Sequence, residues 1–325
     1  MHRRHFFQAS LGALAAGAVG CASVAPATLV GTKTQPATDA AAFRAQRRFL
    51  STSFGEIAYN ERGSGRAALF LHGFPLNSFQ WRGQLDRLSV HRRCIAPDFM
   101  GLGYTKVAPG RSVAPDAQVE MLAELLDKLS VTDVDLVAND SGGAVAQLFV
   151  LKYPKRVRTL LLTNCDVEPD SPPPALKPVL DLAREGKFAD EWLAPWVADK
   201  KLARSSEGLG GMTFTFRSNP TDEAIDYYLG PLVSSVESKA RMHAYALGLD
   251  PNPLAGIEAK LRKCSVPTRI LWGTGDDIFS AESPGYLDRL LPNSRGVRHI
   301  EGAKLFWPEE FPDVIAEEAR ALWGV

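Results

Sequence analysis

An aspartate stands in a turn of small residues, at a position suited to a nucleophile. The segment Leu136 to Gln147 reads as an apolar strand, a tight turn and the start of a helix. A strained turn of this kind lifts one side chain beyond the edge of a sheet. Asp140 is the first candidate, because a carboxylate is already ionised and needs no base before it attacks. Ser141 is the alternative, if Asn139 to Gly143 is taken as a loose Gly-x-Ser-x-Gly pattern.

Three further motifs accompany this turn. They are His72-Gly73-Phe74-Pro75, Asp98 to Thr105, and Trp272 to Asp277, each directly after an apolar run. Together the four motifs resemble those of the α/β-hydrolase superfamily. The resemblance extends over residues 48–323. An aspartate at the nucleophile position narrows it to the branch that contains haloalkane dehalogenases, fluoroacetate dehalogenases and epoxide hydrolases. It implies an α/β-hydrolase fold, with a mostly parallel eight-stranded sheet and an inserted α-helical cap.

The resemblance also implies a role for several residues. In the family the nucleophile precedes the first of two paired glycines by two residues, which favours Asp140. The backbone N–H groups of Phe74 and Ser141 would form an oxyanion hole. Asp276 would be the acid that orients a histidine and stabilises its cation.

Two further aspartates are alternatives for that acid. Asp277 fits the motif less well by its position, and Asp166 follows the preceding strand, where some relatives carry the acid. Asp98 is expected to fix its own loop rather than to take part in the chemistry.

The loop that should supply the histidine departs from the family pattern. Relatives read Gly-Ala-Gly-His-Phe there, whereas this chain has Leu305 in place of the histidine. His299 lies six residues earlier, within a predicted strand, and its ring could not easily reach the site. His243 belongs to the predicted cap and could lie over the turn. The departure affects one step only, because forming an ester on Asp140 needs no base but hydrolysing it does.

Two positions concern the leaving group. Dehalogenase relatives carry Trp or Arg directly after the nucleophile to hold the halide, and this chain has Ser141 there. Epoxide opening needs a tyrosine acid from the cap, for which Tyr227, Tyr228 and Tyr245 are candidates. The adjacent pair Tyr227-Tyr228 is more typical of packing.

Alternating strand and helix patterns must position these residues, and they favour a mostly parallel sheet. Strands are expected at 48–53, 55–61, 67–71, 93–96, 134–138, 159–163, 268–272 and 296–300, and core helices at 117–129, 142–153, 284–291 and 312–323.

An insertion at residues 167–254 interrupts this alternation. It opens with three consecutive prolines and contains helical patterns at 176–184, 190–199, 221–229 and 234–246. We expect it to form the cap, so that residues 46–166 and 255–325 make up the hydrolase core.

The N-terminus has a different composition. Arg3 and Arg4 precede an apolar stretch that is too short to span a bilayer, which predicts a twin-arginine export signal over residues 1–27. A lipoprotein-like sequence ends at Cys21, so lipid anchoring at Cys21 is an alternative to release into the periplasm. Residues 28–45 are expected to be a flexible leader.

Composition limits the partners. Lys and Arg together number 37, as do Asp and Glu, so no net charge favours nucleic acid. Beyond Cys21, Cys94, Cys165 and Cys264 are too scattered for a disulfide framework or a metal site. No cofactor motif is present, and the oligomeric state is not predicted.

Three functions follow from these features. The leading hypothesis is a hydrolase that attacks a small apolar alkyl halide or epoxide with Asp140, with an altered base. The alternatives are a non-hydrolytic binding protein on the same fold, suggested by Leu305, and a serine esterase or lactonase that uses Ser141.

Overall fold

A mostly parallel sheet forms the centre of the molecule. The computed structural model describes residues 38–325, so the expected export signal and Cys21 lie outside the described residues. The strands are β1 (Arg48–Thr52), β2 (Gly55–Arg62), β3 (Ala67–Leu71), β4 (Arg93–Pro97), β5 (Lys106–Val107), β6 (Val134–Asp140), β7 (Val157–Cys165), β8 (Thr268–Gly273) and β9 (Ser294–Ile300).

The strand order is β1-β2-β4-β3-β6-β7-β8-β9, and the short β5 pairs with β2. From β4 to β9 all neighbours are parallel, whereas β1 and β2 are antiparallel to each other and β2 is antiparallel to β4. The predicted eight-stranded α/β-hydrolase sheet is thereby confirmed, with β5 as an unpredicted addition.

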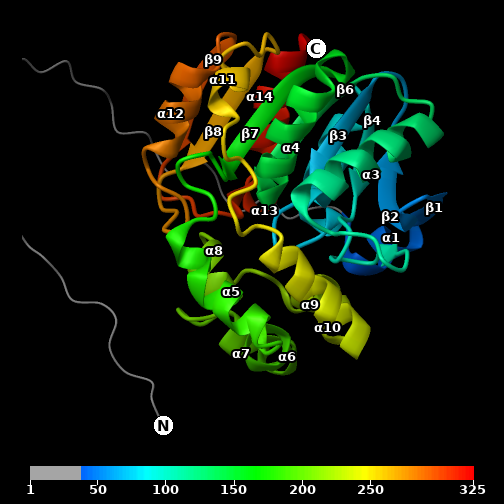
Figure 1. The fold of residues 1–325 in the computed structure, drawn as a ribbon, viewed down its shortest axis with the longest axis vertical. Helices are drawn as coiled ribbons and strands as arrows, with labels where there is room; N and C mark the ends of the chain where they lie inside the picture. The colour runs from blue at the N-terminus through cyan, green and yellow to red at the C-terminus, as the bar shows by residue number, and fades with distance from the viewer. Residues whose placement is uncertain (1–37) are drawn as a thin grey trace, which may run out of the picture.

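Helices cover both faces of this sheet. In Figure 1, α3 and α4 lie in front of the strands and α14 lies behind them, where it packs against α2. Burial on both faces explains why all five residues of β3 are apolar and buried. The core helices are α2 (Arg82–Leu88), α3 (Pro115–Lys128), α4 (Ser141–Lys152), α11 (Glu258–Leu261), α12 (Ser283–Leu290), α13 (Trp307–Glu310) and α14 (Pro312–Trp323).

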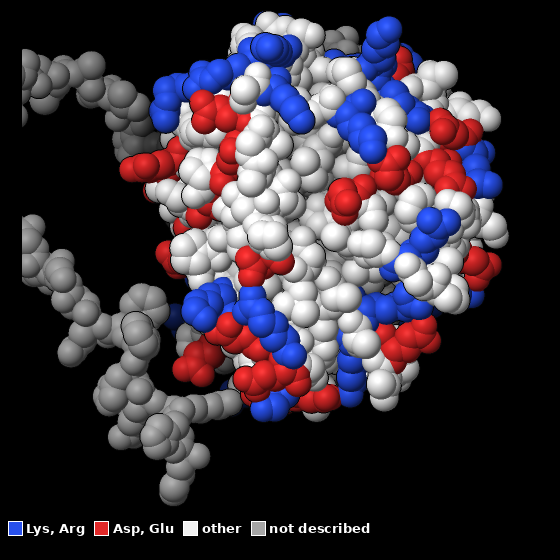
Figure 2. Space-filling model, viewed as in Figure 1, with Lys and Arg blue, Asp and Glu red and all other residues white. Residues whose placement is uncertain are grey.

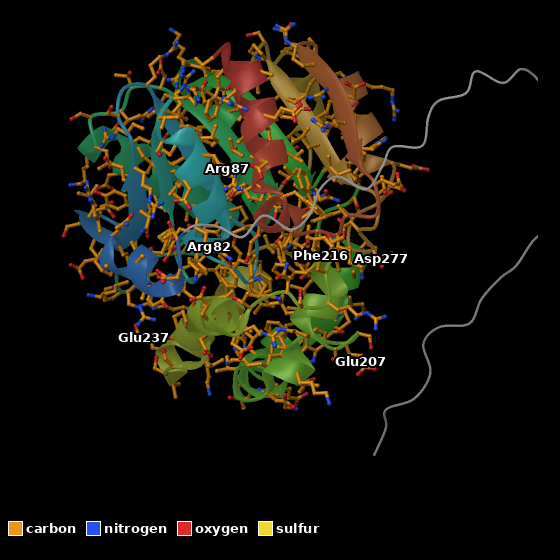
Figure 3. The ribbon with its side chains drawn as sticks, turned by 180° about the vertical axis from the view of Figure 1, so that it is seen from behind. Arg82, Arg87, Glu207, Phe216, Glu237 and Asp277 are labelled. Carbon is orange, nitrogen blue, oxygen red and sulfur yellow. The ribbon has the colours of Figure 1, made fainter. Side chains whose placement is uncertain are left out.

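A group of helices between β7 and β8 forms the cap, which gathers below the sheet in Figure 1. Arg82 from the core and Phe216 from the cap lie at the junction of the two parts (Figure 3). The Arg82 guanidinium donates 2.8 Å to Glu309 of the core and 3.2 Å to the hydroxyl of Tyr228 in the cap. The cap helices are α5 (Lys177–Arg184), a π-helical turn η4 (Ala189–Leu193), α6 (Ala194–Ala198), α7 (Lys200–Ala203), α8 (Leu209–Thr213), α9 (Asp222–Val233) and α10 (Val236–Leu247).

Part of the segment expected to be a flexible leader is helical. The helix α1 (Ala40–Ala45) begins at Asp39, whose carboxylate accepts 2.8 Å from the N–H of Ala42. The reason for the ordering is Phe43, which is fully buried and packs edge-on against Phe79 at 5.2 Å between ring centroids.

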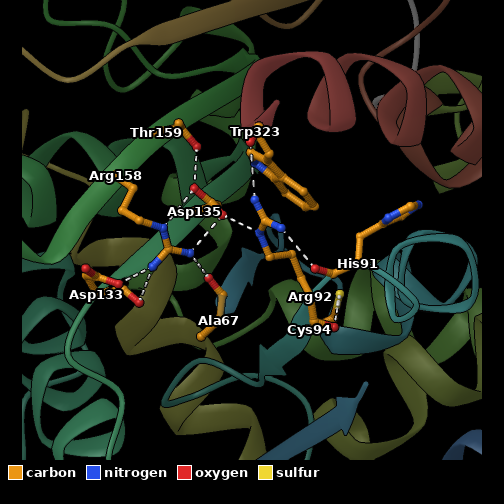
Figure 4. A network of polar contacts seen from close by, with 9 residues as sticks. All are labelled: Ala67, His91, Arg92, Cys94, Asp133, Asp135, Arg158, Thr159 and Trp323. Atoms are coloured by element: carbon orange, nitrogen blue, oxygen red, sulfur yellow. Dashed lines mark hydrogen bonds and ion pairs between the residues drawn. The ribbon is translucent and has the colours of Figure 1, made fainter. Parts of the chain in front are cut away.

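The amino ends of the strands carry a buried network of ion pairs (Figure 4). Asp135, near the start of β6, is 2% exposed and accepts 2.8 Å from both Arg92 and Arg158. Its other oxygen accepts 2.9 Å from the Thr159 hydroxyl. The charges at this edge therefore balance one another, as buried charges must.

The surface is mixed in charge. Figure 2 shows acidic and basic side chains interspersed across the visible face, as the balanced composition predicts. Within residues 38–325, none of the helices has the length and apolar character needed to cross a membrane.

Candidate active site

The turn between β6 and α4 holds Asp140 in an unusual backbone conformation. Its φ of 53° and ψ of −134° lie outside the regions that L residues prefer. The turn is possible because the residues after it are small. A Cβ at Gly142 would lie 2.5 Å from the carbonyl oxygen of His72, and one at Gly143 would lie 2.3 Å from Cβ of Cys165. Strand and helix backbones therefore approach closely, as expected for a turn that presents a nucleophile.

The Asp140 carboxylate faces a cavity and is held by backbone donors. Its Oδ2 accepts 2.7 Å from the N–H of Phe74, and the nearby N–H of Ser141 also favours the ionised carboxylate. The side chain lines the cavity, although the residue is only 7% exposed. Burial raises the pKa of Asp140 well above its usual value, and the nearby Asp166 and Asp276 carboxylates raise it further against the lowering effect of the two N–H groups.

A chain of buried amides fixes the loop that carries Phe74. The N–H of Gly73 donates 3.0 Å to Gln80, whose amide donates 2.6 Å to Asn139. Asn139 in turn donates 3.1 Å to the carbonyl of Leu305. Gly73 cannot be larger, because a Cβ there would lie 2.5 Å from Oδ2 of Asp140. The donor loop, the turn and the loop of Leu305 are thus fixed relative to one another.

The cavity beside Asp140 is small and mostly apolar, with a volume of about 110 Å³. This is somewhat below the ~150 Å³ of a cavity that holds benzene. Cap and core both contribute to the walls. Its aromatic lining consists of Phe74, Phe188, Trp192, Trp196 and Phe279. The site is therefore shaped for a small apolar molecule.

Asp166 is the second carboxylate in this cavity. It directly follows β7, is 2% exposed, and accepts 2.8 Å from the hydroxyl of Ser171. Burial raises the pKa of Asp166 to about 7. The sequence suggested Asp166 as an alternative acid, and the structure places it in the lining of the same cavity as Asp140.

Asp276 lies outside the lining of the cavity. Its Oδ2 accepts 2.9 Å from Asn164, and its Oδ1 accepts 2.9 Å from the N–H of Ile278. Burial raises the pKa of Asp276 to about 6. The neighbouring Asp277 is exposed (Figure 3). Asp276 is therefore held in the loop where the resemblance placed the acid, without a histidine beside it among the described residues.

Leu305 lines the cavity and is 3% exposed, so the histidine position of the family is filled by an apolar side chain. The other candidate histidines do not replace it. His299 is exposed on β9, and Nε2 of His243 accepts 3.1 Å from the N–H of Ala189 within the cap. His72 is buried with its two ring nitrogens bonded to Gly73 and Phe99.

Ser141 and the cap tyrosines are engaged elsewhere. The Ser141 hydroxyl lies 3.0 Å from that of Tyr245, and neither residue lines the cavity. The hydroxyl of Tyr227 is bonded to Arg47, and that of Tyr228 donates 2.6 Å to Glu309. Of the three candidate tyrosine acids, only Tyr245 is thus next to the turn, and it reaches Ser141 rather than the space above Asp140.

Sequence reasoning missed the polar residues that support the site. Asn164, fully buried near the end of β7, donates to Asp276 and accepts 2.7 Å from the N–H of Gly273 and 3.0 Å from the indole of Trp307. The position of Asn164 in the sequence could have revealed this role, because an asparagine at the end of an otherwise apolar buried strand must form hydrogen bonds with its neighbours.

Comparison with known proteins agrees with this fold. Residues 68–306 match the family model described as the alpha/beta hydrolase fold. The chain is 30% identical over 247 residues to the cis-3-alkyl-4-alkyloxetan-2-one decarboxylase of Shewanella oneidensis, covering 72% of this chain and 74% of that protein. It is 29% identical over 292 residues to haloalkane dehalogenase 2 of Mycobacterium tuberculosis, covering 86% and 95%.

Two further similarities are to an epoxide hydrolase and an esterase. Mouse epoxide hydrolase 3 is 25% identical over 279 residues, covering 81% of this chain and 71% of that protein. A solved structure of a thermophilic esterase from Thermogutta terrifontis superimposes with a TM-score of 0.69 at 26% identity, covering 86% and 98%. The strand order, the turn at Asp140 and these matches lead to one conclusion: the chain belongs to the α/β-hydrolase fold family and is similar to its dehalogenases and epoxide hydrolases.

Proposed function

We propose that this protein attacks a small apolar electrophile, an alkyl halide or an epoxide, with the Asp140 carboxylate and then hydrolyses the ester it forms. The observation that carries the proposal is that the turn places the carboxylate of Asp140, and not the hydroxyl of Ser141, in the lining of the apolar cavity. The similarity to a haloalkane dehalogenase and an epoxide hydrolase supports the same chemistry.

The geometry assigns different tasks to the two oxygens of Asp140. Oδ2 is held by the N–H of Phe74, so Oδ1 is the oxygen free to attack. Attack on a saturated carbon forms a C–O bond and releases the halide or opens the epoxide ring. Water then adds to the ester carbonyl, and the backbone donors stabilise the negative charge that develops on its oxygen. The apolar cavity excludes other water, which leaves the carboxylate poorly solvated and reactive.

Intact-mass analysis of protein mixed with 1-bromobutane or 1,2-epoxybutane tests the proposal. At short times we expect an adduct at Asp140, which is a butyl group from 1-bromobutane after loss of bromide and the whole ring-opened molecule from 1,2-epoxybutane. The adduct should then disappear as alcohol or diol forms. Asp140→Asn should form no adduct and no product. Turnover by that variant at the rate of the unchanged protein would refute the proposal.

A second candidate is favoured by Leu305. The relative from Shewanella oneidensis is named for the decarboxylation of an oxetan-2-one, a reaction that consumes no water. Asp140 would attack the saturated ring carbon that is bonded to the ring oxygen. This breaks the bond between that carbon and the ring oxygen and frees a carboxylate. Loss of CO₂ would then form the alkene and expel Asp140 unchanged, so no base is needed. Alkene and CO₂ from a cis-3,4-dialkyloxetan-2-one would support this candidate, whereas a β-hydroxy acid or no product would exclude it.

A further inference from the structure

We infer that Asp166 is the general acid and base of this site, in the place of the histidine that Leu305 replaces. The inference rests on the proposed function, because it assigns the group that transfers protons to and from the intermediate on Asp140. It gives Asp166 direct contact with the reacting water, whereas a triad acid would act only through a histidine.

The strand register brings the two carboxylates together. Asp140 at the end of β6 is paired with Cys165 at the end of β7, and Asp166 is the next residue. The carbonyl of Asp166 accepts 2.7 Å from the side chain of Gln147 on α4, the helix that begins after Asp140. One carboxylate oxygen is bonded to Ser171. The backbone and the direction of the side chain are thus fixed beside the nucleophile.

Asp166 has no competitor within the cavity. Among residues 38–325, Asp140 and Asp166 are the titratable side chains in its lining. The lining otherwise consists of apolar residues, two prolines and Thr213, whose hydroxyl donates 2.6 Å to the carbonyl of Leu209. A water molecule that attacks an ester on Asp140 can therefore pass its proton to Asp166.

The shared environment suits a group that both donates and accepts a proton. Two carboxylates in one poorly solvated cavity cannot both ionise freely, so one of them retains a proton. Two backbone N–H groups favour the ionised form at Asp140, whereas the Ser171 hydroxyl and the backbone N–H of Asp166 itself do so at Asp166. A general acid and base works best when its pKa lies near the working pH, which is where burial places that of Asp166.

The proton balance closes for an epoxide. Ionised Asp140 attacks a ring carbon, the C–O bond breaks, and the released oxygen takes the proton of Asp166. Ionised Asp166 then removes a proton from water, and the hydroxide formed adds to the ester carbonyl. Collapse of the adduct breaks the bond between that carbonyl carbon and the alkyl oxygen. This oxygen takes the proton of the carboxyl group formed on Asp140, and the diol leaves. Asp140 returns ionised and Asp166 returns protonated. An alkyl halide leaves as the halide ion in the first step and needs no proton there. Asp166 must then be ionised before the second step, and it afterwards loses the proton taken from water to solvent, so that HX is released overall.

Single-turnover measurements on Asp166→Asn test the inference. With 1-bromobutane, which needs no proton for the first step, the adduct on Asp140 should form in the variant as in the unchanged protein. Its hydrolysis should be slower by roughly 10²- to 10⁴-fold, the usual contribution of a general base, so that the adduct accumulates. In the unchanged protein, hydrolysis should accelerate as the pH rises towards 7, and this dependence should disappear in the variant.

The controls separate this inference from the proposed function. Asp277→Asn removes an exposed carboxyl and should leave both steps unchanged. Asp166→Glu should recover part of the hydrolysis rate, because a carboxyl is restored. If adducts form but clear equally fast in Asp166→Asn, the inference is wrong and the function of Asp140 stands. If neither probe yields an adduct in any of these proteins, the proposed function fails and this inference with it.

Discussion

Two neighbouring residues in the turn have opposite environments. The Asp140 carboxylate faces the cavity, whereas the hydroxyl of Ser141 is bonded to Tyr245 and does not line it. A serine nucleophile also needs a base, and no histidine lines the cavity within residues 38–325. The geometry therefore favours the carboxylate reading of the motif over the serine-esterase alternative.

Replacing Leu305 by histidine should accelerate ester hydrolysis. The backbone there is fixed by Asn139 and by the bond of 2.9 Å from the N–H of Phe306 to the carbonyl of Thr213, so a new side chain would occupy the same part of the cavity. We expect the adduct on Asp140 to clear about 10²-fold faster, as an added general base provides. Leu305→Gln, which is polar but not a base, is the control. Equal rates in the two variants would mean that no base can work from this position.

At the scale of helices and strands, the sequence predicted those elements that are long enough to show a periodic apolar pattern. Every expected strand is present, and α14 (Pro312–Trp323) has the predicted bounds, because long apolar periods reflect burial on a sheet. The two-residue strand β5 and the six-residue helix α1 are too short to show a period. The helix depends instead on the tertiary contact of Phe43 with Phe79, which local sequence cannot reveal.

The site was predictable in its motifs but not in its contacts. Asp140 and the donor loop of Phe74 follow from recognisable short sequences. The approach of Asp166 to Asp140 depends on the register between β6 and β7, and the support from Asn164 depends on side-chain packing at the strand end. Neither leaves a spacing pattern in the chain, so both had to be found in the structure.

The loop around Leu305 also anchors the cap, and Glu310 is the centre of this attachment. Its carboxylate accepts 2.8 Å from the N–H of Thr215, 2.9 Å from that of Phe216 and 2.9 Å from the amide of Asn219. The attached segment continues from α8, whose Thr213 lines the cavity. A core glutamate thus positions one wall of the site.

Glu310→Ala should loosen this wall. The change leaves backbone N–H groups without their acceptor, which costs about 1–3 kcal/mol. We expect faster amide hydrogen exchange over residues 209–219 and a KM that rises more than kcat falls, because binding is affected before chemistry. Glu317→Ala, at an exposed position on α14, should change neither measurement. Unchanged exchange in Glu310→Ala would show that other contacts suffice to hold the segment.

Across the whole molecule, the two ends of the sheet differ in how their buried carboxylates are neutralised. At the amino ends, the buried carboxylate of Asp135 is neutralised by two arginines. At the carboxyl ends, Asp140 and Asp166 are buried in one cavity without a cationic partner in its lining. The first arrangement stabilises the fold, and the second costs stability in return for reactive groups.

That cost predicts how stability depends on pH. Because the pKa of Asp166 is raised to about 7 and that of Asp140 is also raised above its usual value, these two groups bind more protons in the folded protein than in the unfolded chain above about pH 4. The contribution of these groups to the free energy of unfolding therefore falls as the pH rises from about 4 to 7 and above.

The variant Asp166→Asn lacks the part of this cost that comes from Asp166. In chemical denaturation, the variant should be more stable than the unchanged protein by a few kcal/mol at pH 8, because a tenfold change in proton affinity corresponds to about 1.4 kcal/mol, and equally stable below pH 4. Asp277→Asn should show no such divergence. Parallel curves for Asp166→Asn and the unchanged protein would mean that Asp166 has the same pKa in both states, which its burial and the proposed proton transfer both contradict.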